Sequence, residues 1–202
     1  MATVKFLVGF ICLAVIGRDW SVGSSTLGYG TETKKIVTGR SAPGNDATRI
    51  IGIARKEIGV REQGCENCGI AVAGYLAVVG FKTPQPWCAA FVSWCHAKAG
   101  YLAPRTAWSP SLFPNGKVVG YSSRDLSLWL KMTGHDGKGI VYGIYYPSLG
   151  RIAHCGLVEN LQGEFLQGIE ANTNVAGSRE GDGVRRKIRH KRTIHRYANW
   201  LK

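Results

Sequence analysis

Residues 84–94 have the sequence PQPWCAAFVSW, which predicts where a helix begins and which residue stands at its start. Proline is tolerated just before the first helical turn, because the N–H groups there have no intrahelical partners. Gly100 is a helix stop signal. Between Pro86 and Gly100 apolar residues recur at helical spacing, namely Cys88, Phe91, Val92, Cys95 and Ala99. We therefore expect Cys88 in the first turn of a helix with a buried apolar face.

This position suggests chemistry for Cys88. The positive end of the helix dipole stabilises a thiolate and lowers a cysteine pKa below its ordinary value of about 8.5. A thiolate of this kind becomes a nucleophile when a base lies beside it. The alternative is a small core residue, since free cysteines are among the most buried residues. The helix alone does not decide between the two, so a base has to be sought elsewhere in the chain.

The composition bounds the class of protein. The chain has 202 residues, 45% of them hydrophobic, which suits one globular domain of about 150 residues with an N-terminal extension. The formal net charge of +13 favours an anionic partner: nucleic acid, an anionic membrane surface or an acidic cell-wall polymer. The six cysteines are too scattered in too long a chain to predict a disulfide scaffold.

The N-terminal part is expected to direct export. Residues 1–25 contain Lys5 followed by an apolar run over 6–17, which is shorter than the roughly 20 residues needed to span a bilayer. This pattern predicts a signal peptide or an N-terminal anchor, with a short buried helix as the alternative. Residues 26–44 are predicted to be a linker and residues 45–202 the folded domain. We expect a periplasmic or extracellular protein that contacts a membrane only through its N-terminal segment.

Two further helices are expected before the cysteine helix. One runs from Asn45-Asp46, which can cap it, to Gly59, and the other from about residue 67 to 80. The face predicted to point inward is Ile50, Ile51, Ala54 and Ile58 in the first helix, and Ile70, Ala73, Leu76 and Val79 in the second.

The C-x-x-C pair Cys65 and Cys68 lies between these two helices. A structural zinc site needs a second ligand pair, which the sequence lacks, and a redox pair usually adjoins a strand–helix unit. A local disulfide or two inert thiols are therefore the favoured interpretations.

The C-terminal half predicts strands. Residues 140–146, 152–160 and 164–172 are rich in β-branched and aromatic side chains, and Leu161-Gln162-Gly163 predicts a three-residue hairpin loop. Residues 183–200 carry many basic residues and predict one or two edge strands. The expected fold class is α+β.

The hairpin offers a base for Cys88. Pairing Asn160 with Glu164 places His154 directly opposite Glu170, where Cβ atoms are about 4.5–5.5 Å apart. Asn172 follows on the same face, and a register slip of one residue would turn these faces over. A cysteine at a helix start, a histidine on a strand and a polar residue beside it match the nucleophile–base–orienter arrangement of cysteine peptidases. A structural histidine and an ordinary strand carboxylate are the alternatives.

The other histidines fit this role less well. His96 is about 12 Å along the helix axis from Cys88, which is beyond hydrogen-bonding reach. His135 lies in a Gly/Asp-rich loop, and His190 and His195 lie in the basic C-terminal segment, where surface roles are expected.

Three blocks of sequence resemble the CHAP family of cysteine, histidine-dependent amidohydrolases/peptidases: PWCAAFVSW at 86–94, RIAHCG at 151–156 and GIEANT at 168–173. The resemblance extends from about residue 46 to the C-terminus. It implies a papain-like fold, with N-terminal helices and the nucleophile helix packed on a mostly antiparallel sheet, and cleavage of amide bonds in peptidoglycan. The chain departs from the family at Gly137-Lys138-Gly139, where Gly-Asp is common, and at Ala171, where glycine is frequent.

The resemblance implies Cys88 as nucleophile, His154 as base, Glu170 as the residue that orients His154, and Asn172 as a supporting polar residue. Acyl transfer by a cysteine and a histidine calls for no metal and no organic cofactor, and none is expected. The expected partner is peptidoglycan, cut either as an endopeptidase or as an amidase, and the expected state is a monomer that binds no specific nucleic acid.

Candidate substrate-binding residues are Trp87, Trp108 and Gln85. Gln85 is near Cys88 in sequence and is a candidate donor to an oxyanion. Trp108 belongs to a proline-rich loop with Phe113, and these aromatic side chains either line a cleft or cover the core.

Two non-catalytic functions stay open. One is a basic binding module for cell wall or nucleic acid, based on the charge cluster at 185–202, although only Tyr197 and Trp200 there offer rings for stacking on bases. The other is a catalytically silent wall-binding or phage-structural protein with the same fold.

Overall fold

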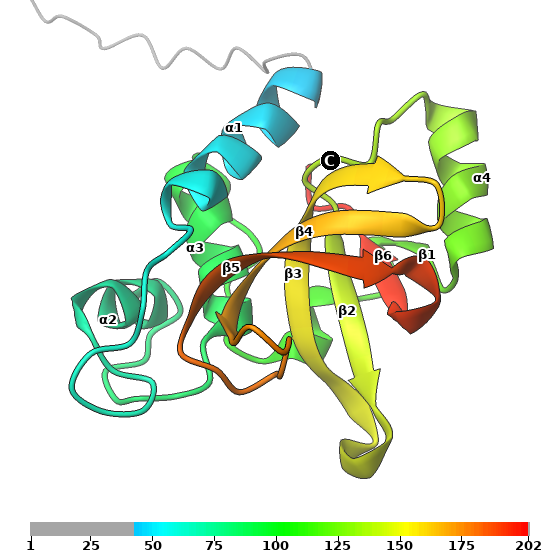
Figure 1. Cartoon of the computed structure of the whole chain (residues 1–202). Coiled ribbons are helices and arrows are strands. Elements are labelled where there is room, and N and C mark those ends of the chain that lie inside the picture. The colour runs from blue at the N-terminus through cyan, green and yellow to red at the C-terminus, as the bar shows by residue number, and fades with distance from the viewer. Residues whose placement is uncertain (1–42, 202) are drawn as a thin grey trace, which may run out of the picture. The chain divides into compact units, whose positions relative to one another are not determined.

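A computed structural model of the chain describes residues 43–201, which form an α+β domain (Figure 1). The expected signal peptide or anchor and nearly all of the linker lie outside the described residues. The four α-helices of the described part are α1 (Pro43–Lys56), α2 (Ile70–Ala77), α3 (Cys88–Lys98) and α4 (Ser123–Thr133). The six strands in this part are β1 (Val118–Gly120), β2 (Val141–Tyr146), β3 (Arg151–Gln162), β4 (Phe165–Thr173), β5 (Gly183–His190) and β6 (Arg196–Ala198).

The strands form one sheet in the order β1-β6-β2-β3-β4-β5, and all neighbouring pairs are antiparallel. Helices α1, α2 and α3 lie on one side of this sheet and α4 on the other (Figure 1). A large core joins Ile50 of α1 and Phe91 of α3 to strand residues such as Leu157. A smaller core joins Leu126 of α4 to Tyr142. The sheet is therefore covered on both faces, and the expected α+β class is confirmed.

Helix α3 is the buried centre of the helical layer. It begins at Cys88 and is followed by Gly100 with φ of 88°, so both predicted limits are confirmed. The residues that recur at helical spacing are all buried, but so are their neighbours Ala89, Ala90 and Ser93. The helix is thus enclosed on nearly all sides over its first two turns, and Cys88 is held at its start.

The β3–β4 hairpin has a different register from the predicted one. Gln162 pairs with Phe165, so the loop is the two residues Gly163-Glu164 and not a three-residue loop. An irregularity between Val158 and Asn160 shifts the register again, and Glu170 then lies opposite Gly156. The predicted direct pairing of Glu170 with His154 is therefore wrong by two residues. A shift of two keeps side chains on the same face, which is why the two residues still meet.

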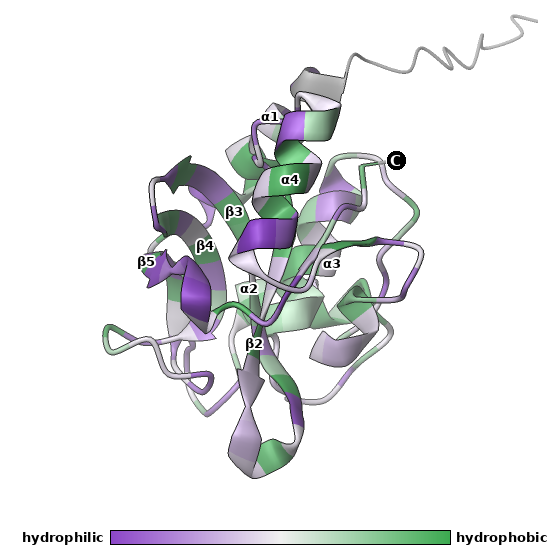
Figure 2. Cartoon of the chain, turned by 90° about the vertical axis from the view of Figure 1, so that its right-hand side faces the viewer, coloured by the Kyte–Doolittle hydropathy of each residue, from purple (hydrophilic) through white to green (hydrophobic). Residues whose placement is uncertain are grey.

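Two elements were not predicted, and one strand was misplaced. Strand β1 and helix α4 occupy a stretch for which no element was expected, and Ser122 caps α4 by accepting a hydrogen bond from the Asp125 N–H at 3.2 Å. Strand β5 is the expected basic edge strand, and its residues are largely hydrophilic (Figure 2). Strand β6, by contrast, lies inside the sheet between β1 and β2.

Of the predicted apolar faces, that of α1 is confirmed at Ile50, Ile51 and Ala54. That of α2 is wrong at Ile70, which is 89% exposed, and at Ala73, which is also exposed, because Val72 and Tyr75 supply the buried side together with Leu76. The helix also begins later than predicted.

Cys65 and Cys68 form a disulfide, which confirms the first of the two interpretations of the C-x-x-C pair. The other cysteines in the described residues, Cys88, Cys95 and Cys155, are free and buried. Within residues 43–201, no helix combines the length and the apolar character needed to span a bilayer.

Candidate active site

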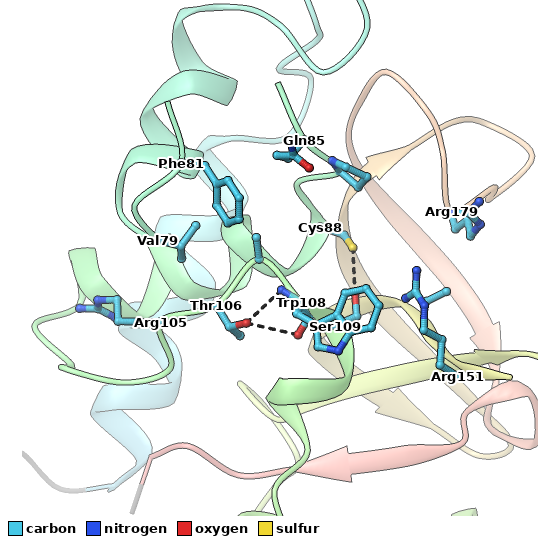
Figure 3. A pocket seen from close by; sticks show the side chains of 13 residues that line it. Val79, Phe81, Gln85, Cys88, Arg105, Thr106, Trp108, Ser109, Arg151 and Arg179 are labelled. Atoms are coloured by element: carbon cyan, nitrogen blue, oxygen red, sulfur yellow. Dashed lines mark hydrogen bonds between the residues drawn. The ribbon is translucent and has the colours of Figure 1, made fainter. Parts of the chain in front are cut away.

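Cys88 opens onto a cavity of about 450 Å³ (Figure 3). The cavity lies between the segment that precedes α3, the loop that leads to the short helix Ser109–Leu112, and the start of β3. Its other lining residues are Val79, Phe81, Gln85, Pro86, Arg105, Thr106, Ala107, Trp108, Ser109, Arg151, Ala153 and Arg179. A substrate can thus reach the thiol although most of the Cys88 side chain is buried.

The surroundings of Cys88 favour its thiolate. Its Sγ lies 3.3 Å from Oγ of Ser109. Hydrogen bonding from Cys155, from His154 and from Ser109 outweighs the effect of burial and places the pKa of Cys88 well below its ordinary value. The neighbouring Cys155 is affected in the opposite direction, since burial raises its pKa and keeps it a neutral thiol. Cys88 is therefore the thiol of the pair that ionises.

His154 lies on β3 between the thiol and a carboxylate. Its Nε2 is 2.8 Å from Oε2 of Glu170, and both side chains are fully buried. Its Nδ1 is buried and, apart from its interaction with the thiol of Cys88, has no hydrogen-bond partner among the described residues. Burial lowers the pKa of His154, but hydrogen bonding to Cys88 and to Glu170 outweighs it and raises this pKa to about 9. Thiolate and imidazolium therefore coexist over a wide range around neutral pH.

Glu170 is held by three partners. Arg189 binds it through two contacts, Nε to Oε1 at 2.7 Å and Nη2 to Oε2 at 2.6 Å, and the Tyr142 hydroxyl donates to Oε1 at 2.7 Å. Burial alone raises the pKa of Glu170, but Arg189 and His154 together lower it to about 2. Arg189 also donates to the Gly177 carbonyl at 3.0 Å. The carboxylate is thus fixed in both charge and position beside the imidazole.

The contact between Tyr142 and Glu170 depends on a glycine in the intervening strand, β3. Tyr142 pairs with Gly156, which pairs in turn with Glu170, so the three residues form a row across β2, β3 and β4. A Cβ atom at Gly156 would lie 2.6 Å from the Tyr142 hydroxyl oxygen and 2.8 Å from Cγ of Glu170. Only glycine leaves room there for the tyrosine to reach the carboxylate.

The structure brings together three of the four predicted catalytic residues. Asn172 is buried, but its side-chain amide donates to the Arg179 carbonyl at 3.4 Å and holds the loop after β4. Its backbone φ is 56°, which asparagine tolerates better than most residues. Asn172 therefore positions a loop at the cavity, and the side chains that hold Glu170 against His154 are Tyr142 and Arg189.

Two of the three predicted substrate-binding residues line the cavity, and the third does not. Gln85 and Trp108 line the cavity, and Trp108 is 52% exposed, with the Arg151 guanidinium 4.0 Å from its ring centroid. The prediction that Trp87 binds substrate is wrong. Its side chain is fully buried, stacks on Tyr75 and donates from Nε1 to Glu62 at 2.8 Å. Trp87 anchors the segment before α3 and has no surface to offer a substrate.

The site also contains four residues that were not predicted from the sequence, namely Ser109, Tyr142, Cys155 and Arg189. Arg189 was counted only as part of a basic strand, and its contact with Glu170 depends on a register that the local pattern does not give. Gly156 was a usable signal, since a glycine within a strand indicates close approach by another group. Within residues 43–201, no group of three or more His, Cys, Asp or Glu side chains is arranged to hold a metal ion.

No family model, no curated protein and no solved structure matches this chain. The likeness to the CHAP family therefore rests on the sequence of this chain alone.

Proposed function

We propose that this protein is a cysteine-dependent amidohydrolase or peptidase with a papain-like fold, and that its substrate is peptidoglycan. The observation that carries the proposal is the buried chain of contacts from Cys88 through His154 to Glu170, with the thiol facing a cavity. The substrate class rests on the resemblance to the CHAP family. The Cys65–Cys68 disulfide supports export, since disulfides persist in oxidising compartments.

The mechanism follows from the protonation states of the pair. The Cys88 thiolate attacks the carbonyl carbon of the scissile amide, and the His154 imidazolium donates its proton to the departing amine. The neutral imidazole then takes a proton from water, and the resulting hydroxide hydrolyses the thioester and releases the thiolate. Glu170 stabilises the imidazolium and orients the ring, while Arg189 and Tyr142 hold Glu170.

The oxyanion formed in each step needs donors near Cys88. The backbone N–H of Cys88 lies in the first turn of α3, where N–H groups have no intrahelical acceptor. The side-chain amide of Gln85 lines the same cavity and is the second donor in this mechanism.

The experiment compares wild type, Cys88→Ala and Cys95→Ala on purified peptidoglycan by the release of new amino groups. Cys95→Ala is the matched control, because it removes a buried thiol from the same helix without touching the cavity. We expect release by wild type and Cys95→Ala and only background release by Cys88→Ala. Equal release by wild type and Cys88→Ala would contradict the proposal, and binding without release by wild type would favour the non-catalytic wall-binding module. Mass spectrometry of the fragments would identify the bond.

A further inference from the structure

The cavity at Cys88 is lined by three arginines and by no acidic residue, namely Arg105, Arg151 and Arg179. Arg105 is committed to its own loop, since its guanidinium donates to the carbonyls of Tyr101 at 2.5 Å and Pro104 at 2.7 Å. The positive charge available to a ligand therefore comes from Arg151 and Arg179.

Arg151 is held with most of its donors unused. Its guanidinium stacks on the Trp108 ring, and its one hydrogen bond within the described residues runs from Nη1 to the Ile152 carbonyl at 3.2 Å. Stacking fixes the plane of a guanidinium but leaves its N–H edge free to bind an anion. The ring and the guanidinium together form one wall of the cavity.

Arg179 reaches the same cavity from the loop between β4 and β5. The loop is tied down by Asn172, which donates to the Arg179 carbonyl, and by Thr173, whose hydroxyl donates to the Ser178 carbonyl at 2.7 Å. The Arg179 side chain is about a quarter exposed and forms an ion pair with Glu180, a residue that does not line the cavity. Figure 3 shows Arg151 and Arg179 on the same side of Cys88, although they come from distant parts of the chain.

We propose that Arg151 and Arg179 form a carboxylate-binding subsite, so that the substrate carries an acidic group beside the scissile amide. The role in substrate choice rests on the proposed function, but anion binding next to the thiol does not. A guanidinium binds a carboxylate through two parallel N–H donors, and two guanidinium groups from different elements would fix its position as well as its charge. Neutral peptides would lack this contact and bind less well.

The first experiment measures anion binding with the thiol itself as the reporter. Iodoacetate and iodoacetamide alkylate Cys88 by the same displacement of iodide by sulfur, and they differ in that only iodoacetate carries a carboxylate. The measured quantity is the ratio of the two second-order rate constants at low ionic strength. The imidazolium of His154 attracts iodoacetate in every variant, so the change in this ratio isolates the arginines.

We expect the double variant Arg151→Gln/Arg179→Gln to lower the ratio at least about fivefold, and each single variant to lower it less. Arg124→Gln is the control, because it removes one positive charge from an exposed site on α4 outside the cavity, and its ratio should stay within about twofold of wild type. An unchanged ratio in the double variant would overturn the subsite, and this includes the case in which both reagents slow equally.

The second experiment tests substrate choice with peptidoglycan whose carboxylates have been converted to amides by a carbodiimide and ammonia. Wild type should hydrolyse the amidated polymer with a higher KM than the untreated polymer, whereas the double variant should treat the two alike. Hydrolysis of both polymers with the same KM by wild type would overturn the role of the subsite in substrate choice. If neither polymer is hydrolysed, the proposed function fails, while the alkylation ratio still decides whether the subsite exists.

Discussion

Glu159 and Glu170 are two buried carboxylates on the neighbouring strands β3 and β4, and each binds an arginine of β5 through two hydrogen bonds. Arg186 binds Glu159 at 2.5 and 2.9 Å, much as Arg189 binds Glu170. The remaining partners differ. Glu159 has a second arginine, Arg55 of α1, at 2.6 Å. Glu170 has instead the fully buried His154.

This difference separates a structural carboxylate from one that belongs to the proposed catalytic site. The arginine side chains on Glu159 are about half exposed, at 50% for Arg55 and 44% for Arg186, so they bring positive charge from the surface and tie α1 to the sheet. The carboxylate of Glu170 stabilises an imidazolium that in turn faces a thiolate. The same kind of carboxylate–arginine contact, which we call a clamp, thus holds α1 against the sheet at Glu159 and keeps His154 protonated at Glu170.

The largest effect should come from Glu170→Gln. The amide keeps the approximate shape of the side chain but removes the charge that stabilises the His154 imidazolium, so we expect kcat on peptidoglycan to fall by at least about 100-fold. KM should change much less, because Glu170 does not line the cavity. Circular dichroism would check that the variant is folded. A folded Glu170→Gln protein with wild-type kcat would contradict the catalytic role of this clamp.

The matched change Glu159→Gln should act on stability and not on turnover. It leaves Arg55 and Arg186 facing a neutral amide at a buried position, and we expect the free energy of unfolding to fall by about 1–3 kcal/mol. Urea denaturation would measure this loss. A fall in kcat similar to that of Glu170→Gln would show that the comparison between the two clamps is wrong.

A smaller effect is expected from Arg189→Lys. Lysine keeps the positive charge but loses the two-point contact, so Glu170 should be less well oriented and kcat should fall by about threefold to tenfold. The alkaline limb of the kcat profile should also move below pH 9, because a less firmly held carboxylate stabilises the imidazolium less. Arg186→Lys, which changes the arginine on Glu159, is the control. An equal shift of the alkaline limb in this variant would contradict the proposed difference between Glu159 and Glu170.

The nucleophile helix was predictable because its signals are local. Pro86 precedes it, apolar residues follow at helical spacing, and Gly100 ends it. Helix α4 carried comparable signals that went unused, namely Ser122 before it, Gly134 after it and Leu126 on its inner side. The local sequence therefore contained enough signals to predict α4 as well as α3.

The contacts around Glu170 were less predictable because they depend on strand register. The irregularity between Val158 and Asn160 has no local signature, and it places Glu170 opposite Gly156. The prediction that His154 and Glu170 are in contact is nevertheless confirmed, because a register error of two residues leaves every side chain on the same face of the strand. Arg189 approaches from a third strand, and no local pattern indicates which carboxylate it binds.

The central claim is that Cys88 and His154 form a thiolate–imidazolium pair. The most direct measurement is the rate constant for alkylation of Cys88 by iodoacetamide as a function of pH, with the modified cysteine identified by peptide mass spectrometry. Because the pKa of Cys88 is lowered, the thiolate should already react rapidly near pH 6, where a thiol with an ordinary pKa of about 8.5 is almost wholly protonated.

A second change in rate should appear near pH 9, where His154 loses its proton and the ion pair ends. Glu159→Gln should reproduce this profile, and Glu170→Gln should shift the first rise to higher pH. A single rise near pH 8.5 in the wild-type protein, unaffected by Glu170→Gln, would contradict the ion pair.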